Sequence, residues 1–216
     1  MIKFSWEFHA AIENFKRMKI AIIKYNAGNI RSVSFALDRL GVEHVITADP
    51  EEIRSADKVI FPGVGEASST MKYLKENKLD ELILGLKQPV LGICLGMQLM
   101  CSHSEEGDVK CLGIFDEKVK KFELPSPNSE NIKVPHMGWN ALVNVNSALF
   151  DASLEKEYVY FVHSYYVALG EHTAATTNYI LPYSSALHKD NFYATQFHPE
   201  KSGDVGSRIL ENFIKL

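Results

Sequence analysis

The sequence predicts an α/β fold: a single doubly wound, mostly parallel sheet with helices on both faces, and additional mixed or antiparallel strands in the C-terminal half. Three observations support this prediction. Short apolar runs alternate with amphipathic stretches up to about residue 113, glycine-containing turns directly follow two of these runs, and short strands separated by turn residues follow residue 113. Ligands of doubly wound sheets bind at the carboxyl ends of the strands, so a functional site is expected at those turns.

The first half of the chain is expected to consist of strand and helix units. Residues 20–23 are an uninterrupted apolar run typical of a buried strand, and the next segment places apolar residues three or four apart until Gly41. The same two patterns then recur along the chain. The expected strands are 20–23, 42–47, 59–61 and 90–93, and the expected helices are 30–40, roughly 67–86 and a helix from Leu95.

The second half is expected to form a largely antiparallel or mixed region that ends in a helix. Residues 188–191 have the composition of a hairpin turn, and residues 204–216 place apolar side chains on one helix face. The expected strands are 118–124, 139–145, 158–162, 166–169, 174–179 and 192–197, with a polar loop over 125–135.

Residues 19–216 are expected to be one domain, because we find no linker, repeat or low-complexity tract within them. Residues 1–18 are an extension of uncertain status. Phe4, Phe8, Ile12 and Phe15 are spaced as on one helix face, which suggests an added docking helix. Translation that starts at Met18 explains the same segment equally well.

The composition excludes several classes of protein. With 46% apolar and 23% charged residues the chain is expected to fold, and a net charge of −4 without a basic run argues against nucleic-acid or anionic-membrane partners. No apolar run approaches the roughly 18 residues of a membrane helix, and charged residues interrupt any N-terminal signal peptide. Three cysteines without a C-x-x-C pair suggest a reducing, cytoplasmic location. The histidines show no metal-ligand spacing, so no metal or cofactor is expected.

The strongest local signal is the segment Gly92-Ile-Cys94-Leu-Gly96, which lies between an expected strand and an expected helix. It has the form of a nucleophile elbow, with cysteine at the position where many hydrolases have serine. Glycines two residues before and after the nucleophile allow close backbone approach in a crowded turn. The positive end of the helix dipole favours the thiolate of Cys94. The alternative, a buried structural cysteine, is disfavoured by this context.

A nucleophilic cysteine needs a base, and the base needs an orienting group. His198 follows an expected strand, and Glu200 lies two residues later, where it can hold the other imidazole nitrogen. We therefore predict a Cys94-His198-Glu200 triad. The turn Pro62-Gly-Val-Gly65 also follows a strand, and the N–H groups of Val64 and Leu95 could stabilise an oxyanion, although a turn without a catalytic role is about equally compatible with the spacing.

These motifs together resemble the class I, or triad, glutamine amidotransferases, over essentially all of the chain from Lys19 onward. Further segments resemble the glutaminase subunits of imidazole glycerol phosphate synthases. The segments are Tyr25-Asn-Ala-Gly-Asn29, Pro62-Gly-Val-Gly65, Val134-Pro-His-Met-Gly-Trp-Asn140, Tyr160-Phe-Val-His-Ser-Tyr165 and Thr195-Gln-Phe-His-Pro-Glu-Lys-Ser-Gly203.

The resemblance implies roles for individual residues. Cys94 would be the nucleophile, His198 the base and then the acid, and Glu200 its orienting group. The oxyanion hole would comprise Gly63, Val64 and Leu95. Glutamine would be held by Gly65, Gln98, Glu106, His163, Ser164 and Tyr165. The resemblance also implies a heterodimer with a (β/α)₈ cyclase that receives the ammonia and serves histidine biosynthesis. Partner contacts would include Asn29, Trp139, Asn140, Tyr160 and Lys201.

The sequence departs from the family pattern in the first loop, where Lys24 replaces an acidic residue and Asn26 replaces a glycine. This departure leaves the triad unaffected and concerns only contacts near the partner. Three alternatives stay open at this point: a related glutaminase that feeds an amino-sugar or other synthase, a non-catalytic binding subunit, and a cysteine hydrolase or chaperone with the same elbow.

Overall fold

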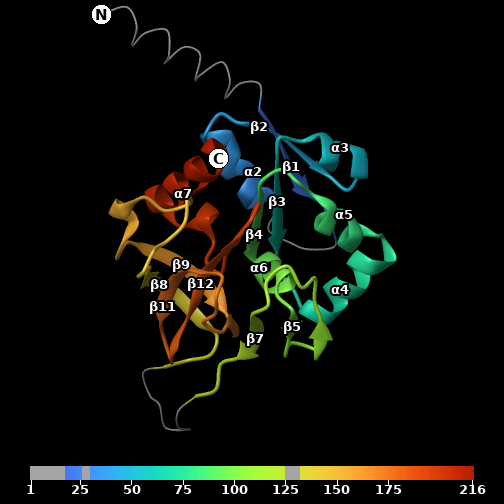
Figure 1. The fold of residues 1–216 in the computed structure, drawn as a ribbon. Coiled ribbons are helices and arrows are strands. Elements are labelled where there is room, and N and C mark those ends of the chain that lie inside the picture. The colour runs from blue at the N-terminus through green and yellow to red at the C-terminus, as the bar shows by residue number, and fades with distance from the viewer. Residues whose placement is uncertain (1–17, 26–29, 125–131) are drawn as a thin grey trace, which may run out of the picture.

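The computed structural model describes residues 18–25, 30–124 and 132–216, and within these residues it confirms the predicted α/β fold (Figure 1). The expectations for residues 1–17, for Asn29 and for most of the 125–135 loop lie outside the described residues. An eleven-stranded sheet runs through the described part of the chain, and a separate two-stranded ribbon lies beside it.

Five parallel strands form one half of the sheet, in the order β2-β1-β3-β4-β13. They are β1 (Lys19–Ile23), β2 (Glu43–Thr47), β3 (Lys58–Gly63), β4 (Val90–Cys94) and β13 (Phe192–Thr195). This is the strand order of a doubly wound fold, whose ligands bind at the carboxyl ends of the strands.

The other half of the sheet is mixed, as the change of pattern after residue 113 predicts. Its strands are β5 (His103–Ser104), β6 (Val109–Lys110), β7 (Lys118–Lys121), β10 (Tyr165–Val167), β11 (Thr173–Asn178) and β12 (Pro182–Lys189). The separate ribbon pairs β8 (His136–Ala141) with β9 (Tyr158–His163) in antiparallel register.

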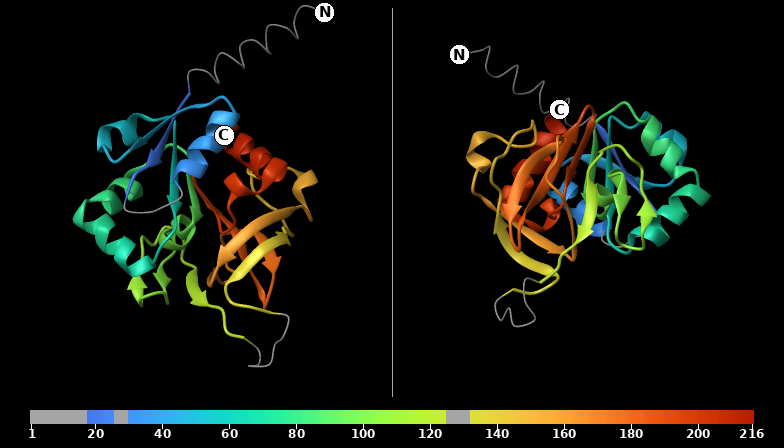
Figure 2. Two further views of the ribbon diagram at one scale, coloured as in Figure 1. Left: turned by 180° about the vertical axis from the view of Figure 1, so that it is seen from behind. Right: turned by 60° about the horizontal axis from the view of Figure 1, so that its bottom comes forward.

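Helices cover both faces of the sheet. Successive residues of a strand point to opposite faces, so each buried strand contributes apolar side chains to both layers of helices. Ile20 and Ile22 of β1 enter one apolar core, and Ala21 and Ile23 enter the other. The first core includes residues of α2 (Ile30–Arg39), α7 (Gly203–Lys215) and strand β9 of the ribbon. The second core includes α3 (Pro50–Ser55), α4 (Ala67–Glu76), α5 (Leu79–Gly85) and α6 (Leu95–Met100). Figure 2 shows α2 and α7 together on the side of the sheet opposite α4 and α5.

Several predicted boundaries are wrong. The single helix expected over roughly 67–86 is two helices, because Lys78 adopts a left-handed φ of 54° between α4 and α5. Helix α3, whose N-terminus is capped by Asp49, was not expected, and neither were β5, β6 and β12 as strands. The strand expected at 139–145 is β8 at 136–141, and those expected at 118–124, 166–169 and 192–197 are shorter or shifted. Two short 3₁₀ turns, Ala152–Leu154 and Pro199–Lys201, complete the order of elements.

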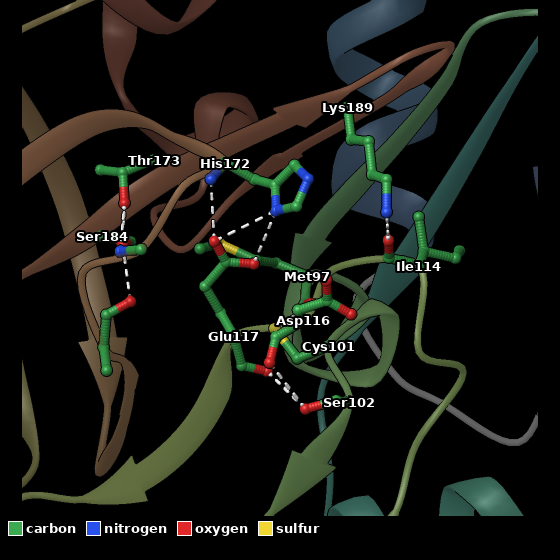
Figure 3. Close-up of polar contacts among 12 residues, drawn as sticks. Met97, Cys101, Ser102, Ile114, Asp116, Glu117, His172, Thr173, Ser184 and Lys189 are labelled. Atoms are coloured by element: carbon green, nitrogen blue, oxygen red, sulfur yellow. Dashed lines mark hydrogen bonds and ion pairs between the residues drawn. The ribbon is translucent and has the colours of Figure 1, made fainter.

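A buried polar cluster supports the end of α6 that lies away from the predicted nucleophile (Figure 3). The Glu117 carboxylate accepts the backbone N–H of His172 at 2.8 Å and lies 3.2 Å from the Nδ1 atom of that residue. The Ser102 hydroxyl donates to the Glu117 carbonyl at 3.0 Å, and Cys101 next to it is fully buried. These contacts fix the segment after α6 to β7 and β11, and so hold the helix that begins directly after Cys94.

Candidate active site

Cys94 occupies a strained turn of the kind that a nucleophile elbow requires. It is the last residue of β4, α6 begins at the next residue, and its backbone angles are φ 54° and ψ −108°. Residues other than glycine rarely adopt such angles. A Cβ atom on Gly96 would lie 2.0 Å from the Phe61 carbonyl oxygen, and one on Gly92 would lie 2.8 Å from the Met100 sulfur. Gly96 is therefore required by close packing, as the motif predicts, and a Cβ atom on Gly92 would also lie only 3.1 Å from backbone atoms of Gly96 and Met97.

Parallel register brings the predicted residues to one edge of the sheet. Gly63 of β3 lies opposite Cys94 of β4, and Thr195 of β13 lies opposite Ile93. The chain that continues from Thr195 thus reaches His198 at the same edge. Three segments meet there, the last of them more than 100 positions after the other two in the sequence, because the carboxyl ends of neighbouring parallel strands coincide.

His198 and Glu200 form a buried hydrogen-bonded pair. Nδ1 of His198 lies 2.8 Å from Oε1 of Glu200, with side chains 1% and 0% exposed. The carboxylate therefore accepts from Nδ1–H and leaves Nε2 as the basic nitrogen. Burial alone lowers the pKa of His198, but hydrogen bonding and charge interactions with Cys94 and Glu200 outweigh it and raise this pKa to about 10. The imidazolium is thus stabilised when the cysteine is a thiolate.

The turn proposed as an oxyanion hole is closely packed against the elbow. A Cβ atom on Gly63 would lie 2.8 Å from Cβ of Leu95 and 2.9 Å from the Gly96 nitrogen. The Tyr25 hydroxyl donates a hydrogen bond to the Pro62 carbonyl and so holds the end of β3. The Gly63-Val64 peptide consequently lies beside the N-terminus of α6.

A cavity of about 360 Å³ opens in front of Cys94, within the size range of small-molecule sites. The residues that line it are Val64, Gly65, Cys94, Leu95, Gln98, Glu106, Pro135, Val162, His163, Ser164, Tyr165 and His198. All six residues predicted to hold glutamine are among them. Two larger depressions, of about 650 and 570 Å³, lie elsewhere on the described part of the chain and are not lined by Cys94 or His198.

Polar groups in the cavity are oriented by the protein. Oε2 of Glu106 accepts the backbone N–H of Ala67 at 2.9 Å, and burial raises the pKa of Glu106. A carboxylate that is partly removed from water is stabilised by a nearby positive charge. Glu106 therefore favours a cationic ligand group, such as an α-ammonium. Nε2 of Gln98 donates to the Tyr165 carbonyl at 3.1 Å. His163 lines the cavity, but its nitrogens contact the Tyr165 carbonyl at 2.6 Å and the Tyr183 hydroxyl at 3.3 Å, so its side chain supports the wall.

The residues predicted to face a partner lie mostly on the β8–β9 ribbon. Trp139 is 55% exposed, and its ring lies 6.0 Å from that of Tyr160, its neighbour across the ribbon. Asn140 is half-buried and donates to the Asn178 carbonyl at 2.9 Å, whereas Lys201 is exposed beside Glu200. The ribbon also exposes Met137 and Tyr158, so an apolar surface adjoins the site.

Two polar residues of the site were not anticipated. Gln196 is fully buried and lies between Gln98 and Cys94, and Tyr25 anchors β3. A signal for Gln196 was available, because it lies two positions before His198 and alternate residues of an extended chain share a side. Tyr25 follows β1 at the same sheet edge, but that edge is defined only by the assembled strand order.

The two other cysteines, Cys101 and Cys111, are buried away from the cavity. Cys101 is fully buried just past the end of α6, and Cys111 is 6% exposed. Burial raises the pKa of both thiols. Within the described ranges no cluster of three or more potential metal ligands occurs. Nor does any helix in that part of the chain have the length and apolar character to cross a membrane.

Comparison with known proteins identifies the family of this chain. The model of the family "Glutamine amidotransferase class-I" matches residues 21–216. The imidazole glycerol phosphate synthase subunit HisH of Bacteroides thetaiotaomicron is 66% identical over 199 residues, which are 92% of this chain and 100% of that protein. The subunit of the same name from Idiomarina loihiensis is 44% identical over 92% of this chain and 98% of its own length.

Solved structures show the same fold at much lower identity. A glutamine amidotransferase from Thermotoga maritima superposes with a TM-score of 0.59 at 17% identity, over 90% of this chain and 81% of that one. Another structure described as a glutamine amidotransferase reaches a TM-score of 0.67 at 20% identity, over 90% and 97% of the two chains. From the family match and the close relatives, the chain belongs to the class-I glutamine amidotransferases, within the family of imidazole glycerol phosphate synthase HisH subunits.

Proposed function

We propose that this protein is the glutaminase subunit of an imidazole glycerol phosphate synthase, in which Cys94, His198 and Glu200 hydrolyse glutamine to glutamate and ammonia. The observation that carries the proposal is the convergence of a positive-φ cysteine and a buried His-Glu pair on one cavity. The lining of that cavity supports an amino-acid substrate, because the cavity is lined by carboxylate, amide and backbone groups. Family membership supports the assignment to this synthase over the amino-sugar alternative.

In the first half of the reaction the enzyme is acylated. Nε2 of His198 holds the proton of the Cys94 thiol, and the sulfur attacks the γ-carbonyl carbon of glutamine. Negative charge moves to the carbonyl oxygen, where the N–H groups of Val64 and Leu95 stabilise it. The C–N bond then breaks as the imidazolium protonates the leaving nitrogen, which departs as ammonia. The product is a thioester between Cys94 and the glutamyl group.

In the second half water hydrolyses the thioester. Nε2 of His198 accepts a proton from water as the oxygen attacks the same carbonyl carbon, and the C–S bond breaks to release glutamate and the Cys94 thiolate. Glu200 keeps the imidazole in one tautomer throughout. Gly65, Gln98, Glu106, Ser164 and Tyr165 hold the α-ammonium and α-carboxylate of glutamine, while His163 orients Tyr165.

The proposed partner is a (β/α)₈ cyclase that forms a heterodimer with this chain and consumes the ammonia in histidine biosynthesis. Trp139, Asn140, Tyr160 and Lys201 are the contacts we propose, since the exposed aromatic ribbon and Lys201 adjoin the catalytic residues. A partner bound at this surface would therefore be separated from His198 by only a few atoms. We further propose a cytoplasmic location and one amidotransferase domain over residues 19–216.

The test uses the complex of this chain with its cyclase. Cys94→Ser should abolish imidazole glycerol phosphate synthesis from glutamine and leave synthesis from ammonium salt close to wild type, because ring closure takes place on the cyclase. The matched control is Cys111→Ser, a buried cysteine outside the cavity, which should retain both activities.

Two outcomes would contradict the proposal. Loss of the ammonium-dependent reaction in a folded, associated Cys94→Ser complex would refute the division of labour between the subunits. Glutamine-dependent activity that needs a different synthase would refute the assignment of the partner and leave the glutaminase chemistry intact.

A further inference from the structure

The orientation of two buried amides near Cys94 follows from one backbone carbonyl. The side-chain amide of Gln98 has one end 3.1 Å from the carbonyl oxygen of Tyr165, an atom that can only accept a hydrogen bond. That end of Gln98 is therefore its NH₂ group. The same nitrogen lies 3.0 Å from the side-chain amide of Gln196, and its partner there must be an acceptor, Oε1 of Gln196.

The NH₂ group of Gln196 consequently faces Cys94, and its nitrogen lies 3.7 Å from Sγ. A reversed amide would place two NH₂ groups against each other and turn an oxygen toward the thiolate, which the low-dielectric interior makes costly. Gln196 is fully buried, and its backbone N–H donates to the Ser185 carbonyl at 2.9 Å. The backbone of Gln196 is thus fixed by Ser185, and its side-chain amide is oriented by Gln98.

A hydrogen-bond donor fixed against a buried sulfur favours the charged form of the cysteine. His198 supplies a second stabilising group, but it must give up and take back protons during turnover. The amide of Gln196 is neutral and exchanges no proton in the reaction, so its contribution persists whichever protonation state His198 has. Its N–H remains directed at sulfur whenever the sulfur carries negative charge.

We propose that Gln196 is a further catalytic residue that stabilises the Cys94 thiolate, and that it couples this thiolate to the substrate-holding Gln98. The inference rests on the proposed glutaminase function. The stabilisation of the thiolate by Gln196 acts before glutamine is attacked, and again when the thioester C–S bond breaks and its electron pair returns to sulfur. Because Oε1 of Gln196 and the Tyr165 carbonyl both hold Nε2 of Gln98, the oxygen end of Gln98 is presented to the ligand.

The experiment compares three variants. Gln196→Met keeps the side-chain length and removes both the donor to sulfur and the acceptor for Gln98. Gln196→Glu keeps an acceptor for Gln98 but places a carboxylate beside Cys94. The control is Ser185→Ala, which lies next to Gln196 and removes a buried hydroxyl that has no hydrogen-bond partner within the described residues.

The first measurement is the pH dependence of Cys94 alkylation by iodoacetamide in the free chain, with the modified peptide identified by mass spectrometry. For Gln196→Met we expect the half-maximal rate to move upward by about one pH unit, the size expected when one hydrogen bond to a charged group is lost. For Gln196→Glu we expect a larger upward shift, because the like charge opposes the thiolate. Ser185→Ala should match the wild type.

The second measurement is glutaminase kinetics in the cyclase complex. Gln196→Met should lower kcat about tenfold, the equivalent of one pKa unit, and should raise KM because Gln98 is released. Gln196→Glu should lower kcat while KM stays close to that of the wild type. Ammonium-dependent synthesis at the wild-type rate reports that each complex is folded and associated.

Wild-type alkylation profiles and wild-type kcat in both Gln196 variants would overturn the inference. If Gln196→Met does not fold, the alkylation profile and the kcat and KM of Gln196→Glu decide the question. Alkylation requires neither glutamine nor the cyclase. A wild-type complex without glutaminase activity would therefore refute the proposed function, while the alkylation profiles would still test the donor.

Discussion

Substitution of Gly96 by alanine tests whether the contact between β3 and α6 builds the site. The new Cβ atom would lie 2.0 Å from the Phe61 carbonyl oxygen, whereas ordinary contacts begin at about 3.4 Å. Both groups are backbone or attached directly to it, so no side-chain rotation relieves the clash. The strand and the helix must separate by roughly 1.4 Å.

This displacement affects both stability and catalysis. Overpacking of a buried backbone contact costs about 3 kcal/mol, near the upper end of the usual range, because no flexible atom can yield. The same movement separates the Gly63-Val64 peptide from the Leu95 N–H. Loss of one oxyanion donor lowers kcat by about 10²- to 10³-fold.

The assay combines urea unfolding of the free chain with glutamate release by the cyclase complex. The matched control is Gly85→Ala, at the end of α5, where a new Cβ meets no atom within 4 Å; its unfolding free energy should change by less than about 0.5 kcal/mol. Wild-type stability together with wild-type kcat for Gly96→Ala would refute the packing argument.

Three further predictions concern the base, the partner surface and pH. His198→Ala should lower kcat more than Glu200→Gln does. The loss of kcat in the double variant should be smaller than the product of the two single losses, because the two residues act as a unit; kcat values for the three variants check this. The free chain should be a poor glutaminase, and Trp139→Ala or Lys201→Ala should weaken stimulation by the cyclase more than basal turnover, as measured by glutamate release with and without the cyclase and its ligand. Burial lowers the pKa of His163 to about 3 and that of His136 to about 4, so the unfolded chain binds additional protons below about pH 6.5. The unfolding free energy should therefore fall as the pH drops from 6.5 to 4, with His163 contributing up to about 1.4 kcal/mol per pH unit, and it should fall less steeply in His163→Gln.

The predicted stimulation by the partner has a physical basis in the turn Pro62-Gly-Val-Gly65, which we propose as the oxyanion hole. A glycine-flanked peptide can populate two orientations, and docking can favour the one whose N–H faces the oxyanion. High activity of the free chain, unchanged when the cyclase is added, would refute this explanation.

Most elements of the fold could be predicted from local patterns, and the errors have specific causes. Strands β1 and β4 are continuous apolar runs because both faces of the sheet are covered, and the elbow glycines mark the turn after β4. The break between α4 and α5 was missed because a lysine such as Lys78, unlike a glycine, gives no indication in the sequence of a positive φ. Strand β12 was missed although its edges pair with β11 and β13, since its residues carry no clear alternation.

The sequence by itself determined which residue types we propose as catalytic, because the Gly-x-Cys-x-Gly turn and the His-Pro-Glu segment are local motifs whose chemistry depends on short spacing. Only the tertiary structure decided what surrounds them. Gln196 and Tyr25 gain their roles from parallel strand register, which aligns chain segments far apart in sequence. The direction of the Gln196 amide depends on the carbonyl of Tyr165, 31 positions earlier in the chain, and no pattern of neighbouring residues encodes such a contact.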